Sequence, residues 1–257
     1  SEEDDWHNRL CDMELHFAPL PENLDLRATT LHALQDPASY IESSFAGRLA
    51  LYVDGSARGH AAAWSVIAVE YDGQGLPTLL GALSGQVELN HSSTQWIGAT
   101  NADNVAAELT ASIAAHLAAI ALGHPAFTVI RPDLKLSAML STSTWSCQSH
   151  SDLAAIARWL GAWFAQGGGT CNEVRGHSAH PWNDLADSVA RHALSVATPV
   201  GAIDFDFCHQ LLISGDIAWA WIGLQPPCYA QCLPPNGVST SWLAQPSLRK
   251  VGAPPSS

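Results

Sequence analysis

Four acidic side chains stand where separate elements of an α/β chain come together. Mg²⁺ prefers oxygen ligands and keeps several of its waters, so carboxylates from different elements suit it. Acids that crowd together without a cation repel one another and raise one another's pKa values. The four candidates for a divalent-cation site are Asp54, Glu108, Asp133 and Asp187.

Structural explanations compete with a metal site at these positions. Asp54 lies in Asp-Gly-Ser, which is typical of a turn, and Asp133 follows Pro132, where an acid suits the first turn of a helix. Glu108 is harder to explain in this way. It lies within Val-Ala-Ala-Glu-Leu-Thr-Ala, in a helix too apolar to be solvated on all sides, so it needs a partner such as a cation.

The residues that must position these acids have the pattern of an α/β domain over 48–196. Apolar runs predict five strands, helical spacing of apolar residues predicts three helices, and Pro132 marks the expected first turn of a fourth. A meander of three strands followed by alternating helices and strands indicates a mixed sheet flanked by helices. Sites in open α/β sheets form at the carboxyl ends of strands, where Asp54 and Asp133 lie. The predicted strands are 49–53, 62–71, 79–89, 126–131 and 170–175, and the predicted helices are 101–122, 152–166 and 182–194.

The segment from Arg175 to Asp187 carries the most specific motif in the chain. It reads Arg-Gly-His-Ser-Ala-His-Pro-Trp-Asn-Asp-Leu-Ala-Asp, with the spacing G-H-x-x-x-x-x-N-x-x-A-D. Together with Tyr52-Val-Asp-Gly-Ser56 and Ala107-Glu-Leu109, this motif closely resembles the type 1 ribonuclease H family. The resemblance covers about residues 48–196, and the predicted order of elements agrees with it.

This resemblance implies a ribonuclease H-like fold, with a five-stranded mixed sheet flanked by helices and irregular N- and C-terminal flanks. It also implies hydrolysis of the RNA strand of RNA–DNA hybrids with two Mg²⁺ ions, for which Mn²⁺ can substitute. Two such ions activate a water molecule and stabilise the leaving oxygen. The four acids match the family's metal-binding carboxylates, and His177 matches the loop histidine that helps proton transfer and product release.

Contacts to the substrate also follow from the resemblance. Asn104 matches an Asn that touches the hybrid, and Asn183 matches an Asn that structures the last helix. Discrimination of RNA from DNA requires a contact to the 2′-OH group. Asn104 and main-chain groups near Gly55, Ser56 and Ala57 are the candidates for that contact.

Two departures from the family pattern motivate an alternative function. The run Arg131-Pro-Asp-Leu-Lys135 stands where the family usually has Asp-Ser, and no basic substrate-gripping protrusion is visible between Asp133 and the last strand. The alternative is a catalytically inactive ribonuclease H-like module that binds or connects. A serine hydrolase is disfavoured, because Gly176-His-Ser-Ala-His180 ends in His where a nucleophile elbow has Gly.

Charge is distributed unevenly along the 257 residues, which carry 11 basic and 24 acidic side chains and a net charge of −13. Residues 1–47 hold two basic and ten acidic side chains, which predicts an acidic arm or the tail of an upstream domain. Residues 197–257 are rich in Pro and predict an extension or linker. Such a chain lacks the broad basic surface that binds nucleic acid tightly without metal. Cations at the four acids could still meet the phosphates.

Other features bear on location and partners. The six cysteines form no C-x-x-C pair, which disfavours a zinc site and favours a reduced, intracellular protein of the nucleus or cytoplasm. The apolar stretch Val105–Leu122 contains Glu108 and His116, which predicts a buried helix rather than a membrane span. Because the chain does not begin with Met, we expect it to come from a retrotransposon-type polyprotein, linked to a reverse transcriptase or an endonuclease.

Overall fold

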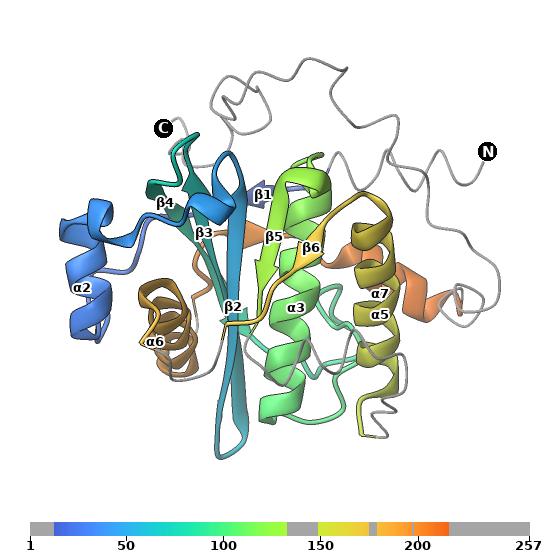
Figure 1. Ribbon diagram of the computed structural model, residues 1–257. Coiled ribbons are helices and arrows are strands. Elements are labelled where there is room, and N and C mark those ends of the chain that lie inside the picture. Colours follow the sequence, from blue (N-terminus) through green and yellow to red (C-terminus); the bar gives the residue numbers. More distant parts are fainter. Residues whose placement is uncertain (1–12, 133–148, 175–178, 197, 216–257) are drawn as a thin grey trace, which may run out of the picture.

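Three long strands form an antiparallel meander, and two short parallel strands extend it on one side. The structure is a computed structural model that describes residues 13–132, 149–174, 179–196 and 198–215. The strands are β2 (Leu49–Arg58), β3 (Ala61–Tyr71), β4 (Pro77–Gln86), β5 (Thr128–Arg131) and β6 (Thr170–Cys171). They lie in the order β4-β3-β2-β5-β6 (Figure 1). The predicted mixed five-stranded sheet is therefore confirmed.

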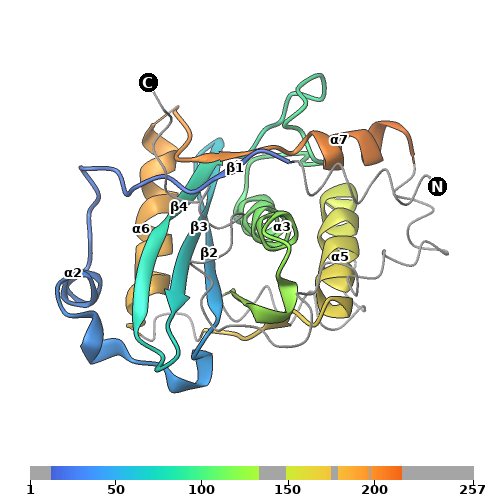
Figure 2. The same ribbon diagram turned by 90° about the horizontal axis from the view of Figure 1, so that it is seen from above.

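Helices cover both faces of this sheet. They are α2 (Ala28–Gln35), α3 (Asn104–Ala121), α5 (Ser151–Gln166), α6 (Pro181–Ser195) and α7 (Asp206–Ile213). α3 and α5 lie on one face, and α6 lies on the other with α2 outside it (Figure 2). Side chains of a strand alternate between its two faces. Leu51 and Val53 of β2 accordingly join the core around α3, whereas Ala50 and Tyr52 join the core around α6.

The strand β2 continues through Asp54-Gly55-Ser56, where the sequence predicts a turn. That prediction is wrong, because Asp54 pairs with Ser65 of β3 and Gly55 pairs with Trp64. The reversal of the chain lies further on, after Arg58, where Gly59 takes a positive φ of 64° that suits glycine. Asp54 therefore stands inside a regular ladder, which fixes its backbone more firmly than a turn would.

The long Ala-rich helix α3 lies in the centre of the molecule. It is long and apolar enough to cross a membrane by length and composition, but 78% of its most apolar window is buried against the sheet and α5. Its small Ala side chains let it pack closely against β2. The prediction of a buried core helix is confirmed.

Both flanks of the sheet domain contribute buried side chains to its cores within the described residues. β1 (Leu15–His16) pairs with β7 (Ala202–Ile203), so the two flanks meet in a small sheet of their own. Buried aromatic residues anchor them: Phe17 and Phe45 before the sheet, and Phe207 after it. The divisions at residues 47 and 196 stay predictions. The short 3₁₀ helices are η1 (Pro37–Tyr40), η2 (Ser43–Phe45) and η3 (Pro125–Phe127).

His116 makes stability depend on pH. It is fully buried on α3, and burial lowers its pKa to about 4, although a hydrogen bond from Nδ1 to the carbonyl of Ser112 opposes this shift. The unfolded chain takes up a proton near pH 6.5, whereas the folded chain does so only near pH 4. We therefore expect stability to fall as the pH drops from about 6.5 to about 4, by up to roughly 3 kcal/mol from this residue.

The variant His116→Gln should flatten that dependence, because it removes the titrating group and keeps a donor for Ser112. Chemical denaturation at pH 7.5 and pH 4.5 measures the difference. His60→Gln, a substitution at an exposed residue of the β2–β3 turn, is the control and should leave the dependence as in the parent. An unchanged slope in His116→Gln would contradict the prediction.

Candidate functional site

The backbone of β2 touches the first turns of α3 at Gly55. A Cβ atom built on Gly55 would lie 2.5 Å from the backbone N of Glu108 and 2.7 Å from the carbonyl carbon of Ala107. No larger residue fits there without moving the strand or the helix. The contact places Glu108 directly beside the residue that follows Asp54. The contact therefore fixes the backbones that carry Asp54 and Glu108 relative to each other.

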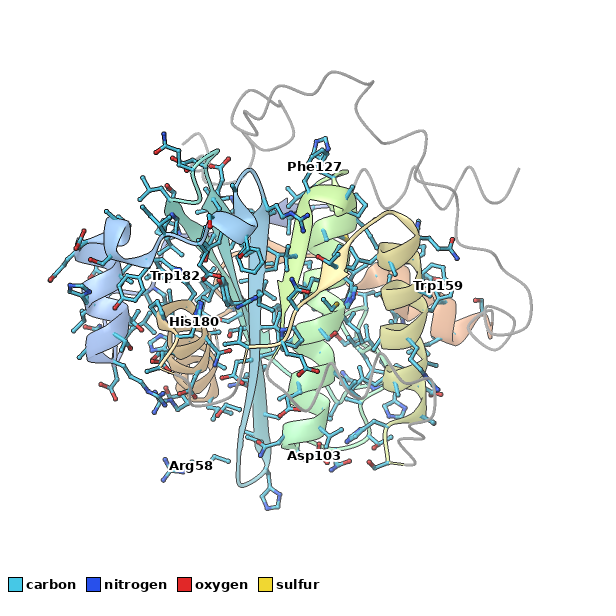
Figure 3. All side chains as sticks on the ribbon, in the orientation of Figure 1. Arg58, Asp103, Phe127, Trp159, His180 and Trp182 are labelled. Atoms are coloured by element: carbon cyan, nitrogen blue, oxygen red, sulfur yellow. The ribbon has the colours of Figure 1, made fainter. Side chains whose placement is uncertain are left out.

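The N-terminal turn of α3 is held by Asp103. Its Oδ1 accepts a hydrogen bond from the backbone N–H of Ala106 at 2.8 Å, and its carboxylate also lies 3.1 Å from Nε2 of His150. Burial opposes the charge, but the hydrogen bonds outweigh it and lower the pKa of Asp103. Asp103 and Arg58, at the tip of β2, lie at the same end of the molecule (Figure 3). A rigid helix start therefore carries Asn104 and Glu108, one turn apart on one helix face.

A second contact places α6 over the same part of β2. Ser65 is the ladder partner of Asp54, and its hydroxyl donates to the carbonyl of Ala186 at 2.8 Å. Residues directly opposite each other in a ladder point to the same face of a sheet. Asp54 therefore points to the face that α6 covers, where Asp187 follows Ala186. Three of the predicted ligands thus come from one strand and from two helices that contact it, Asp54 from β2, Glu108 from α3 and Asp187 from α6.

Asp187 is already paired with two cations. Its Oδ2 lies 2.9 Å from Nη2 of Arg27, and its Oδ1 lies 3.2 Å from Nε of Arg191. Among the residues that the structure describes, no three His, Cys, Asp or Glu residues are close enough to hold a metal ion together. The hard oxygen donors of Asp54 and Glu108 suit Mg²⁺, whereas Asp187 would first have to exchange an arginine for the ion.

Two predicted residues, Asp133 and His177, lie outside the described residues. The last described pair between β2 and β5 is Tyr52 with Arg131, and the carbonyl of Pro132 then accepts a hydrogen bond from the backbone N–H of Val174 at 3.0 Å. β5 thus ends beside the part of β2 that leads into Asp54.

The predicted substrate-binding residues are distributed around these acids. Ser56 and Ala57 continue the β2 ladder, and within the described residues β5 does not pair with them. The side chain of Asn104 is exposed. Asn183 lies one turn before Asp187 on α6, and its buried Oδ1 finds no hydrogen-bond partner in the described part of the chain. Asn183 is thus packed into the domain, whereas Asn104 faces solvent.

A polar cluster that the sequence analysis missed lies beside the start of α6, where Figure 3 labels His180. Nε2 of His180 lies 2.9 Å from Oε1 of Glu42, and its ring is tilted 31° to that of Tyr52 at 5.0 Å. The hydroxyl of Tyr71 donates to the same Glu42 oxygen at 3.3 Å. Burial alone would raise the pKa of Glu42, but the contact with His180 and the nearby charge of Arg131 lower it.

Glu42 and Arg27 escaped sequence analysis for one reason. Their partners His180 and Asp184 lie more than 130 residues away in the chain, and no local pattern connects them. A weak signal existed for Arg27, which is one of only two basic residues among the first 47. A lone cation in an acidic segment has many possible partners, so its presence does not identify one.

Replacing Gly55 by Ala should damage both stability and the site. The added methyl group would meet backbone atoms of Glu108 and Ala107, and such overpacking typically costs about 1–3 kcal/mol. The control is Gly73→Ala, because a Cβ on Gly73 meets nothing within 4 Å. We expect this control to change the free energy of unfolding by less than about 0.5 kcal/mol. Equal denaturation midpoints for the two variants would contradict the close contact.

No protein-family model matches the chain, and no curated protein matches it by sequence. Solved structures with a similar arrangement include ribonuclease H1 of the archaeon Halobacterium salinarum, at 24% identity and a TM-score of 0.41, covering 58% of this chain and 98% of that one. The N-terminal RNase H domain of a Mycobacterium tuberculosis protein matches at 21% identity and a TM-score of 0.42, over 58% and 95% of the two chains.

The protease–reverse transcriptase of prototype foamy virus is a third similar structure. It matches at 19% identity and a TM-score of 0.42, over 59% of this chain and 21% of that longer one. Because identities and TM-scores are this low, the fold assignment depends on the sheet and helices described above. The mixed five-stranded sheet and its flanking helices match the ribonuclease H fold. The chain therefore has a ribonuclease H-like fold.

Proposed function

We propose that this protein hydrolyses the RNA strand of RNA–DNA hybrids with the help of two Mg²⁺ ions, for which Mn²⁺ can substitute. The observation that carries the proposal is the contact between Gly55 and the backbone of Glu108. It fixes the backbone of the strand that carries Asp54 against the backbone of the helix that carries Glu108, which supports a site built from both elements. The match of the G-H-x-x-x-x-x-N-x-x-A-D motif supports the same function.

In this proposal four carboxylates hold the ions: Asp54, Glu108, Asp133 and Asp187. Bound ions of this kind activate a water molecule and stabilise the leaving oxygen. The chain itself supplies position. The β2–β3 ladder fixes Asp54, the Asp103 cap fixes the turn that carries Glu108, and α6 carries Asp187. His177 is proposed to accept or donate a proton during product release.

Substrate contacts are proposed on the side of the site that faces solvent. The exposed amide of Asn104, one turn before Glu108, can donate to and accept from a nucleic acid. Main-chain groups of Gly55, Ser56 and Ala57 are further candidates for the 2′-OH contact that distinguishes RNA from DNA. Asn183 is proposed to structure the helix that carries Asp187.

The charge of the chain shapes how such a substrate would bind. With a net charge of −13, the protein has fewer basic than acidic side chains and therefore few cations to bind phosphate groups. Affinity for the hybrid should therefore depend on the bound cations. We also propose that the domain acts inside the cell, as part of a polyprotein with a reverse transcriptase or an endonuclease.

One observation favours an alternative function, an inactive ribonuclease H-like module that binds or connects. Both carboxylate oxygens of Asp187 are engaged by arginines, which compensate its charge without a metal. A module that had lost catalysis could keep its acids in this way. The two functions differ in whether the site binds a divalent cation at all.

The proposed function predicts cleavage of the RNA strand of a labelled RNA–DNA hybrid in the presence of Mg²⁺. Asp54→Asn should lower the rate at least about 100-fold, because it removes an anionic ligand that stabilises transition-state charge. Cleavage of the matching RNA–RNA and DNA–DNA duplexes should be much slower. Gel analysis of the labelled strands measures all three substrates.

Glu22→Gln is the matched control, because it removes a carboxylate from an exposed position of the N-terminal segment. It should cleave at the parent rate. Undiminished cleavage by Asp54→Asn would overturn the metal-dependent mechanism. Absence of cleavage, together with absence of Mn²⁺ binding by calorimetry, would establish the inactive module instead.

A further inference from the structure

Arg27 connects the N-terminal segment to a proposed metal ligand. It is the residue before α2, and its guanidinium reaches two acids on one face of α6. Nη1 lies 2.6 Å from Oδ1 of Asp184, and Nη2 lies 2.9 Å from Oδ2 of Asp187. The planar guanidinium presents two parallel N–H groups, which suits a bridge between carboxylates three residues apart on a helix.

The two acids differ in how much they need this arginine. The side chain of Asp184 is only 4% exposed, and a buried carboxylate requires partners. It has a second one, because the hydroxyl of Thr29 donates to its Oδ2 at 2.7 Å. The side chain of Asp187 is 25% exposed and can be hydrated. The ion pair of Arg27 with Asp184 therefore explains why α2 packs against α6. The ion pair with Asp187 is not needed for that packing.

α2 is also attached to α6 without Arg27. The hydroxyl of Thr30 donates to the carbonyl of Pro181 at 3.0 Å, and the contact is buried. With Thr29 on Asp184 and Thr30 on Pro181, the segment stays in place if the guanidinium turns away from Asp187. The Arg27 side chain is 42% exposed, so solvent is available on one side for that movement.

We propose that Arg27 competes with a divalent cation for Asp187 and thereby lowers the affinity of the site for that cation. The guanidinium supplies at Oδ2 part of the positive charge that an ion would supply, so the two compete. This inference rests on the proposed function, because it requires Asp187 to be a ligand. Binding linkage is reciprocal, so a bound cation also weakens the hold of Arg27 on Asp187.

Calorimetric titration of the full chain with Mn²⁺ tests this inference directly. Arg27→Gln removes the charge but keeps an amide donor that can serve Asp184. We expect Mn²⁺ to bind about two- to fivefold more tightly to this variant, which matches the small free energy of a partly exposed ion pair. If Arg27 only held the site together, its loss would weaken Mn²⁺ binding, so that result would overturn the inference.

Two further variants separate charge from attachment. Thr29→Val removes a hydrogen bond to Asp184 and leaves Arg27 on Asp187, so its Mn²⁺ affinity should equal that of the parent. Arg27→Gln leaves the buried Asp184 without its cation and could therefore unfold. In that case the double variant Arg27→Gln/Asp184→Asn removes the buried charge as well. This double variant should also bind Mn²⁺ more tightly than the parent. Unchanged affinity in the folded variants would overturn the inference.

The outcomes also separate this inference from the proposed function. One outcome is that the parent binds Mn²⁺, Asp54→Asn does not bind it, and the Arg27 variants bind it as tightly as the parent. That outcome would overturn the role of Arg27 and leave the proposed metal site intact. If neither the parent nor the Arg27 variants bind Mn²⁺, both the proposed metal site and the role of Arg27 are overturned. Binding that appears only in the Arg27 variants would support the role of Arg27 in its strongest form.

Discussion

The site depends on one main-chain contact, the approach of β2 to α3 at Gly55. Helices and sheets usually pack through side chains, which leaves their backbones apart. Here the missing side chain of Gly55 allows the strand to meet the backbone of Glu108 directly. The acids on either side of the contact are positioned by secondary structure, and such sites hold their geometry better than sites on loops.

Most of the fold could be predicted from sequence because its signals are local. The apolar runs of the strands and the Ala-rich pattern of α3 predicted the type and order of these elements correctly, although β2 runs on to Arg58 and β6 covers only Thr170–Cys171. The Asp-Gly-Ser segment was misread, because local preference favours a turn, whereas pairing with Ser65 and Trp64 of β3 keeps it in the strand. The motifs predicted Asp54, Glu108 and Asp187 as ligands of one site. They could not predict the ion pair between Arg27 and Asp187, because these two residues belong to distant segments of the chain.

The N-terminal segment packs against the domain, although its negative charge suggests a segment surrounded by solvent. Its acidity indicates a solvated arm, yet within the described residues Phe17 and Phe45 are buried and Glu42 contacts His180. Arg27 carries positive charge from this segment to α6, where the proposed ligand Asp187 lies. The segment therefore contributes to the electrostatic balance at α6, which the ribonuclease H-like core alone would leave more negative.

The pairing of β1 with β7 also has a consequence for synthesis on the ribosome. Leu15 pairs with Ile203, so a segment made early receives its partner only when almost all of the described chain has emerged. Contacts between such distant residues slow folding and leave apolar side chains exposed in the interval. The excess acid of residues 1–47 then has a physical use of its own. Net charge of one sign disfavours association between chains, and this segment, which includes Phe17 and Phe45, carries ten acidic side chains against two basic ones.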